Sequence, residues 1–293
     1  METEPRQTVM DNDDPAAIKR VPVQTDVAPP AARKPAITKI QYTQSQIVAV
    51  ARETLREHRV IAGCDSGAFV DAYKVLRTKV LQRMRERGWN SLAVTSPTPG
   101  GGSTLTAINL AISMAAEVDQ TVLLVDANLR EPSIHEYFGF EPAMGLNDYL
   151  LDGTELEQML VHPKGIERLV LLPGTRPLLE SSEMLASPQM IRLVGELKAR
   201  YPSRIVVFDL PHCTTADTLA FLPHVDAALL VLEEGRTTQD DVQHAIAYFQ
   251  STSLLGTVLN KAEIPPPKLA RRRFGGRRAR ETSQTAATPG KMT

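Results

Sequence analysis

Six short runs of apolar residues alternate with amphipathic segments through the middle of the chain. Runs of this kind are typical of strands buried on both faces, because a half-exposed strand alternates apolar with polar residues. The runs are Leu92–Val94, Val122–Val125, Leu169–Leu172, Ile205–Phe208, Ala227–Leu232 and Thr257–Leu259. Helical spacing is found in Thr104–Ala116, Gln189–Arg200, Thr214–Leu222 and Thr237–Phe249. This order predicts an α/β fold with a doubly wound, mainly parallel sheet and helices on both faces.

A longer helix is predicted before the first of these strands, over Asp65–Gly88. One apolar stripe runs along it at spacings of three and four residues: Phe69, Tyr73, Leu76, Val80 and Met84. Asp71, Lys74 and Arg77 lie three residues apart on an adjoining face. From the residues alone, this face is either a solvated ladder of salt bridges or a contact with another subunit.

The ends of the chain differ from this core in composition. Residues 1–45 contain six prolines and few large apolar residues, which predicts a disordered tail. Residues 264–293 carry eight Lys or Arg against one Glu, so this predicted disordered tail is strongly basic, whereas the 293-residue chain has a net charge of −1. A single folded domain is therefore expected between them, over residues 46–263.

The composition also argues against several protein classes. Cys64 and Cys213 cannot build a disulfide framework. No apolar run reaches the ~20 residues of a membrane span. The N-terminal residues lack the basic and apolar regions of a signal peptide. The six histidines show no metal-binding spacing. We therefore expect a soluble, cytoplasmic domain.

The segment SLAVTSPTPGGGSTLTAINLA, residues 91–111, contains the strongest functional signal. A strand, a glycine-rich loop and a helix in this order place backbone N–H groups and a helix N-terminus around a phosphate. The candidate binding residues are Pro99, Gly100, Gly101, Gly102, Ser103 and Thr104, and the Thr104 hydroxyl is also a candidate Mg²⁺ ligand. Ser103 stands where a P-loop needs a lysine, and no lysine occurs between Lys79 and Lys164. A glycine turn without a ligand is the alternative.

Two predicted strands end in an acid, Asp126 and Asp209, at the edge where such sheets bind ligands. Both are candidate Mg²⁺ ligands. Asp126, Asn128 and Arg130 are candidate catalytic residues, although a carboxamide at Asn128 cannot accept a proton at neutral pH. The alternative role for Asp126 is to cap a helix near Pro132.

These motifs resemble those of the cytoplasmic kinase domain of bacterial tyrosine kinases that serve capsule and exopolysaccharide biosynthesis, a relative of the chromosome-partition and septum-positioning ATPases. The resemblance covers Ile61–Ala262 and includes VTSPTPGGGSTLTAINLA, VLLVDANLREPSIHEYFG and IVVFDLP. It implies ATP and Mg²⁺ as cofactors, a contact of Asn260 with adenine, and a membrane co-polymerase (chain-length regulator) as partner. It also implies homo-oligomers formed through Asp71, Lys74 and Arg77.

The chain departs from the family pattern at Ser103, at Asn128 in place of the second acid of D-x-D-x-R, and in having no tyrosine after Tyr248. We therefore expect an ATP–Mg²⁺-binding component of exopolysaccharide biosynthesis or export that resembles a tyrosine autokinase but is degenerate or regulatory, with impaired catalysis. The alternatives are a nucleotide-free scaffold and a partition-type ATPase. A membrane partner would bring the cytoplasmic chain to the inner face of the plasma membrane. The basic tail suits contact with an anionic membrane surface, and nucleic acid is the less favoured partner.

Overall fold

An eight-stranded sheet runs through the computed structural model, which describes residues 46–200 and 203–262. The strands are β1 (Gln46–Val48), β2 (Ser91–Thr95), β3 (Thr121–Asp126), β4 (Val161–Pro163), β5 (Leu169–Leu172), β6 (Arg204–Asp209), β7 (Ala227–Glu233) and β8 (Ser253–Asn260). Their order is β1-β4-β5-β3-β6-β2-β7-β8, and only the β4–β5 pairing is antiparallel. The mainly parallel, doubly wound sheet predicted from the sequence is thus confirmed. The predictions for both tails fall outside the described residues.

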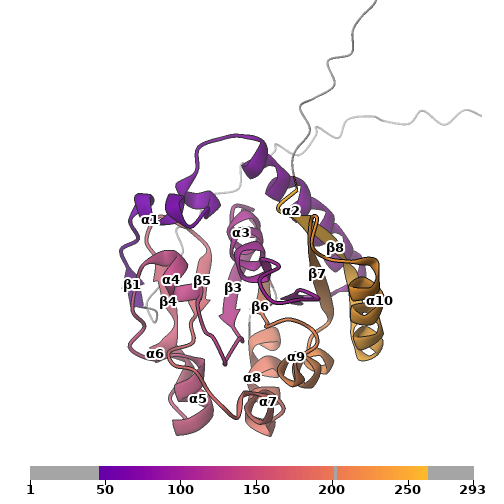
Figure 1. The fold of residues 1–293 in the computed structure, drawn as a ribbon. Helices are drawn as coiled ribbons and strands as arrows, with labels where there is room; N and C mark the ends of the chain where they lie inside the picture. The colour runs from indigo at the N-terminus through magenta and orange to yellow at the C-terminus, as the bar shows by residue number, and fades with distance from the viewer. Residues whose placement is uncertain (1–45, 201–202, 263–293) are drawn as a thin grey trace, which may run out of the picture. The chain divides into compact units, whose positions relative to one another are not determined.

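Helices connect these strands. They are α1 (Arg52–Glu57), α2 (Ala68–Arg87), α3 (Ser103–Ala115), α4 (Ile134–Phe138), α5 (Leu146–Asp152), α6 (Leu156–Met159), α7 (Ser181–Leu185), α8 (Pro188–Ala199), α9 (Ala216–Phe221) and α10 (Gln239–Ala247). Three short 3₁₀ turns accompany them, at Ile61–Gly63, Leu222–His224 and Tyr248–Ser251. In Figure 1, α2 and α3 lie in the upper part of the view and α5, α7, α8 and α9 in the lower part.

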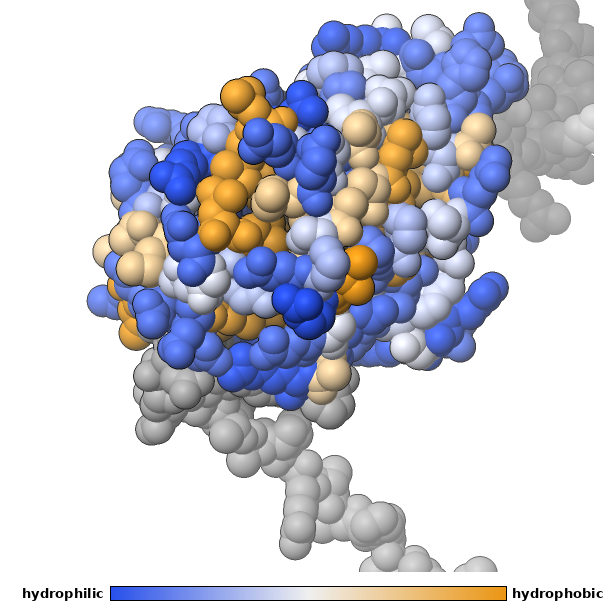
Figure 2. Space-filling view, turned by 90° about the horizontal axis from the view of Figure 1, so that it is seen from below, coloured by the Kyte–Doolittle hydropathy of each residue, from blue (hydrophilic) through white to orange (hydrophobic). Residues whose placement is uncertain are grey.

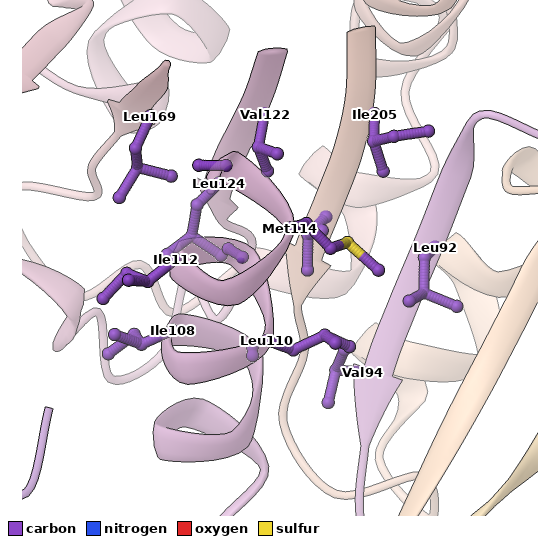
Figure 3. Close-up of a cluster of buried hydrophobic side chains, with 14 of the residues drawn as sticks. Leu92, Val94, Ile108, Leu110, Ile112, Met114, Val122, Leu124, Leu169 and Ile205 are labelled. Atoms are coloured by element: carbon purple, nitrogen blue, oxygen red, sulfur yellow. The ribbon is translucent and has the colours of Figure 1, made fainter. Parts of the chain in front are cut away.

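The central strands bury both of their faces. In β3, Val122 and Leu124 contribute to one hydrophobic core, and Leu123 and Val125 to the other. Helix α3 covers the first core, where its apolar side chains lie against β2, β3, β5 and β6 (Figure 3). Helices α8 and α9 contribute to the second core. Burial on both faces explains why these strands appear in the sequence as continuous apolar runs.

Helix α2 confirms the apolar stripe predicted for residues 65–88, with two differences. Tyr73, Val80 and Met84 are buried, but Phe69 at the start of the helix is exposed. The helix begins at Ala68, three residues after the predicted start at Asp65. It ends before Gly88, whose φ of +68° is a left-handed conformation that glycine adopts readily.

The three charged residues that were predicted to share one face of α2, Asp71, Lys74 and Arg77, do not form one exposed ladder. Lys74 Nζ pairs with Asp71 Oδ1 at 2.8 Å on the surface. Arg77 instead turns toward α3, where its Nε lies 3.0 Å from Glu117 Oε1 and its terminal nitrogen donates to the Ser113 carbonyl oxygen at 3.1 Å. The Arg77 side chain is only 19% exposed. Its charge is thus already paired within the chain, and a role in oligomers stays a prediction.

We expect Arg77→Ala to lower the free energy of unfolding by about 1–2 kcal/mol, because it removes an ion pair and a hydrogen bond between α2 and α3. Urea denaturation at two protein concentrations tenfold apart checks this, since an intrachain contact gives the same loss at both. Lys74→Ala is the matched control and should change stability by less than ~0.5 kcal/mol. A loss that appears only at the higher concentration would contradict the intrachain role.

The surface seen from below is mostly hydrophilic, with hydrophobic side chains gathered in a few places (Figure 2). The exposed large hydrophobic residues include Leu151 in α5, Leu179 before α7 and Ile191 in α8. Across residues 46–200 and 203–262, no helix combines the length and apolar character needed to cross a membrane.

Candidate functional site

The glycine-rich loop connects β2 to α3 and takes a conformation that its glycines make accessible. Gly100 and Gly102 have φ values of +74° and +87°, which side chains with a Cβ rarely adopt. Gly102 directly precedes the first turn of α3, and its carbonyl oxygen accepts from the Thr106 backbone N–H at 3.0 Å. A Cβ on Gly101 would lie 2.9 Å from Ser96 Cβ, so the chain doubles back closely on itself. The loop therefore leads directly into a helix N-terminus, as a phosphate site requires.

The end of β8 fixes the outer side of this loop. Asn260 Nδ2 donates to the Gly101 carbonyl oxygen at 3.0 Å, and Lys261 Nζ donates to the Gly100 carbonyl oxygen at 3.1 Å. Lys261 also pairs with Glu233 Oε1 at 2.7 Å. The structure therefore places Asn260 against the loop, and its contact with adenine stays a prediction. These bonds use carbonyl oxygens, so they leave the N–H groups of Gly100 and Gly101 for a ligand.

A cavity of about 760 Å³ opens beside the loop. Most of the predicted binding and catalytic residues line it: Pro99, Gly100, Gly102, Ser103, Thr104, Asn128 and Arg130. Gly101 is not among the lining residues, and Asp126 and Asp209 are completely buried beside it. The volume is in the range typical of small-molecule sites. The loop and the segment after β3, far apart in sequence, thus face one space.

Asp126 and Asp209 are direct neighbours on the paired strands β3 and β6. Asp126 Oδ2 accepts from the backbone N–H groups of Ser133 and Ile134 at 2.9 and 3.0 Å, so this oxygen does cap α4. Within the described residues, Asp126 Oδ1 and both Asp209 carboxylate oxygens make no well-formed hydrogen bond, although the Thr104 hydroxyl lies close enough to Asp209 to affect its pKa. Three buried carboxylate oxygens so close together lower the stability of the fold unless a cation or solvent binds them.

Burial raises the pKa of Asp126 to about 7, against the opposing effect of the Ile134 and Ser133 N–H groups. Burial, and then the Asp126 charge, raise the pKa of Asp209 well above its usual range, and the Thr104 hydroxyl opposes this shift. These residues fit Mg²⁺, which favours hydroxyl and carboxylate oxygens and keeps further positions for water and phosphate. The described residues offer no cluster of three or more His, Cys, Asp or Glu for a metal, so the remaining ligands would have to be solvent and substrate.

This carboxyl pair should make stability depend on pH. Because the folded pKa values lie above the unfolded ones, the folded chain holds protons that the unfolded chain releases, and stability falls as pH rises through the folded pKa. Without Mg²⁺, we expect a loss of about 2 kcal/mol in the free energy of unfolding between pH 6 and pH 8. Urea denaturation in EDTA measures it, with Asp209→Asn as a reference that should show a smaller loss. Stability that stays level or rises over this range would contradict the prediction.

Arg130 is held at the cavity by a residue that sequence reasoning missed. Its Nε lies 3.2 Å from both carboxylate oxygens of Asp217, in the first turn of α9. The Asp217 side chain is fully buried, whereas that of Arg130 is 52% exposed. No motif in the sequence marks Asp217, because its partner lies 87 residues away and only the folded chain brings them together.

Asn128, His212 and Cys213, which follow the ends of β3 and β6, differ in their positions relative to the cavity. Asn128 lines the cavity, and its Oδ1 accepts from the Glu131 backbone N–H at 3.3 Å, which closes a turn. His212 lines the cavity and contacts Thr214, and burial lowers its pKa. Cys213 is instead buried in the second hydrophobic core, where desolvation raises the pKa of its thiol to about 11. Cys213 therefore does not take part in the site.

Comparisons with known proteins give a consistent result, although no family model matches the chain. The chain is 32% identical over 198 residues to the tyrosine-protein kinase YwqD of Bacillus subtilis, and the match covers 66% of this chain and 81% of YwqD. It is 29% identical to the tyrosine-protein kinase Etk of Escherichia coli, with 65% of this chain and 26% of Etk covered. The chain thus spans about a quarter of the length of Etk, and 28% of that of EpsB of Ralstonia solanacearum.

Solved structures agree with the sequence matches. The kinase domain of Escherichia coli Etk matches with 27% identity and a TM-score of 0.60, over 67% of this chain and 78% of that domain. The VpsO kinase domain matches with 26% identity and a TM-score of 0.60, over 66% and 96% of the two chains. MinD of Pyrococcus horikoshii, complexed with Mg-ADP, is 22% identical with a TM-score of 0.50 over 60% and 74%, a likeness that concerns the fold alone.

Proposed function

Because this chain belongs to the bacterial tyrosine-protein kinase family, we propose that it binds ATP and Mg²⁺ and serves as a component of exopolysaccharide biosynthesis or export. The observation that carries the proposal is the pairing of the glycine-rich loop with two buried carboxyls at one end of the sheet. The relative ExoP of Rhizobium meliloti, named for succinoglycan biosynthesis transport, and the kinases above support the process.

Each part of the site has a distinct role in this proposal. The loop N–H groups and the start of α3 hold the phosphates. Thr104, Asp126 and Asp209 would hold Mg²⁺, which neutralises charge on the β- and γ-phosphate oxygens when bound. Neither Asp209 oxygen makes a well-formed hydrogen bond within the described residues, whereas Asp126 uses one oxygen on α4. Asp209 is therefore the stronger ligand candidate of the pair, and Asp126 can orient a water through its second oxygen.

We further propose that phosphoryl transfer is weak in this chain, so that it acts as a degenerate or regulatory member of the family. Ser103 brings no charge to the transferring phosphate, and a positioned cation there is worth orders of magnitude in rate. Asn128 cannot accept a proton at neutral pH. Robust Mg²⁺-dependent tyrosine phosphorylation by the purified chain would contradict this part of the proposal.

Nucleotide binding itself is tested by thermal unfolding. A ligand that binds only the folded state stabilises it by about 2.7 kcal/mol at 100 times its dissociation constant. We expect ATP with Mg²⁺ to raise the melting temperature, and ATP with EDTA to raise it less. No protection at millimolar ATP and Mg²⁺ would favour the second candidate, a nucleotide-free interaction module, for which Ser103 is the motivating observation.

The same resemblance supports proposals on partners and location. We propose a membrane co-polymerase as partner, which would bring the chain to the inner face of the plasma membrane. Homo-oligomers remain part of the proposal. Because Arg77 is paired with Glu117 inside the chain, an oligomer contact on this face would rest on the exposed Asp71 and Lys74. Co-purification of the tagged chain with a membrane co-polymerase from the same cells would test the partner directly.

A further inference from the structure

One permanently charged cation lines the cavity in spite of Ser103, together with the acidic side chains of Glu131 and Glu136. Among the described residues that line it, Arg130 is the one whose side chain is always charged. It comes from the segment after β3, whereas Ser103 opens α3, and the same cavity brings both to one space. A cation at this position can act on a ligand held by the glycine-rich loop.

Asp217 fixes one edge of the Arg130 guanidinium. Both Asp217 carboxylate oxygens lie 3.2 Å from Arg130 Nε, and Asp217 has no exposed surface. Helix α9 holds Asp217 rigidly, since Thr215 caps the helix and Thr218 Oγ1 donates to the Pro211 carbonyl oxygen at 3.0 Å. A buried carboxylate without its cation is strongly disfavoured, so the pair keeps Arg130 in place.

The rest of the guanidinium is free to bind a ligand. Within the described part of the chain, the terminal nitrogens of Arg130 make no hydrogen bond, and the side chain is 52% exposed. Guanidinium N–H groups match phosphate oxygens in a planar, two-point geometry that a lysine cannot form. The anchored Nε thus presents the terminal N–H groups as a preformed anion contact.

We propose that Arg130, positioned by Asp217, supplies to the polyphosphate of a bound nucleoside triphosphate the positive charge that Ser103 cannot provide. This inference rests on the proposed function. It explains how the chain retains a triphosphate site without the loop lysine. Arg130 touches the ligand, and Asp217 acts through Arg130 as a positioning residue.

Calorimetry of the full chain with ATP–Mg²⁺ and ADP–Mg²⁺ tests this inference. We expect Arg130→Ala to weaken ATP binding about tenfold or more, with a smaller loss for ADP, which lacks the terminal phosphate. Asp217→Asn should weaken ATP binding by a smaller factor, about threefold. Arg85→Ala is the matched control, because Arg85 is 56% exposed and pairs with Asp119 away from the cavity, and it should bind as the wild type does.

The decisive comparison is between Arg130→Ala and the double variant Ser103→Lys/Arg130→Ala. A lysine at position 103 should restore most of the lost ATP affinity, because it supplies a positive charge to the phosphates from the glycine-rich loop. If Arg130→Ala unfolds because it leaves the buried Asp217 carboxylate unpaired, the double variant Arg130→Ala/Asp217→Asn replaces it in all of these measurements.

Two results would overturn this inference and leave the proposed function intact. One is that Arg130→Ala binds ATP as tightly as the wild type does. The other is that Arg130→Ala loses affinity for ATP and ADP equally and that Ser103→Lys does not restore it. No ATP binding by the wild-type chain would instead overturn the proposed function, and this inference with it.

Discussion

The Asp209→Asn variant should lose Mg²⁺-dependent ATP binding and at the same time become more stable than the wild type. The carboxylate of Asp209 is fully buried and neither oxygen makes a well-formed hydrogen bond within the described residues, so it is both the best-placed metal ligand and a destabilising charge. We expect the affinity for ATP–Mg²⁺ to fall about 100-fold, because the variant removes a proposed metal ligand, and loss of a residue that only supports a ligand already costs about 10–100-fold in metal affinity. At pH 8 without Mg²⁺, the free energy of unfolding should rise, because the amide replaces a buried carboxyl whose pKa is raised in the folded chain.

The control for this prediction is Asp226→Asn, outside the cavity. Asp226 is paired with Lys198 at 2.6 Å and accepts from Ser91, so its pKa is lowered rather than raised. Removing that charge should cost stability and leave ATP affinity unchanged. A destabilised Asp209→Asn variant that still binds ATP–Mg²⁺ would show that Asp209 is a structural residue.

The Gly102→Val variant should lose nucleotide binding because it changes the conformation of the glycine-rich loop. Gly102 has a φ of +87°, and a Cβ there would lie 2.1 Å from Asn260 Nδ2. A β-branched residue would have to leave this conformation and displace Asn260, which breaks the bond from Asn260 to the Gly101 carbonyl oxygen. We expect ATP affinity to drop at least tenfold, with a loss of about 2–3 kcal/mol in the free energy of unfolding.

Gly195→Ala in α8 is the matched control. A Cβ at Gly195 meets nothing within 4 Å, and alanine favours the helix by about 1 kcal/mol over glycine. This variant should be slightly more stable and bind ATP normally. If Gly102→Val binds ATP as the wild type does, the loop does not hold the phosphates.

The strands of the sheet were predictable because both of their faces are buried, and each strand is therefore a continuous run of apolar residues. The run Leu169–Leu172 coincides with β5, and the other strands extend the predicted runs by a few residues at their ends. The start of α3 after Gly102 also followed from the glycine-rich loop. The short elements β1, β4, α1 and α4–α7 were missed, because three to seven residues carry no readable periodicity.

Side-chain pairings across the fold were the other part that sequence could not supply. The bond between Arg130 and Asp217 and the bond from Asn260 to the loop join residues 87 and 159 positions apart. Only the strand order places them together. The inward turn of Arg77 likewise depends on how α2 packs on α3, which the spacing of charges along one helix does not reveal.

The central claim is that this family member still binds ATP–Mg²⁺ at its loop although Ser103 replaces the lysine. The most direct measurement is calorimetry of ATP–Mg²⁺ with the wild-type chain and with Ser103→Lys. The account predicts a micromolar dissociation constant for the wild type and tighter binding for Ser103→Lys. Binding by Ser103→Lys alone would contradict the claim and identify a nucleotide-free scaffold, and no binding by either protein would contradict the placement of the site itself.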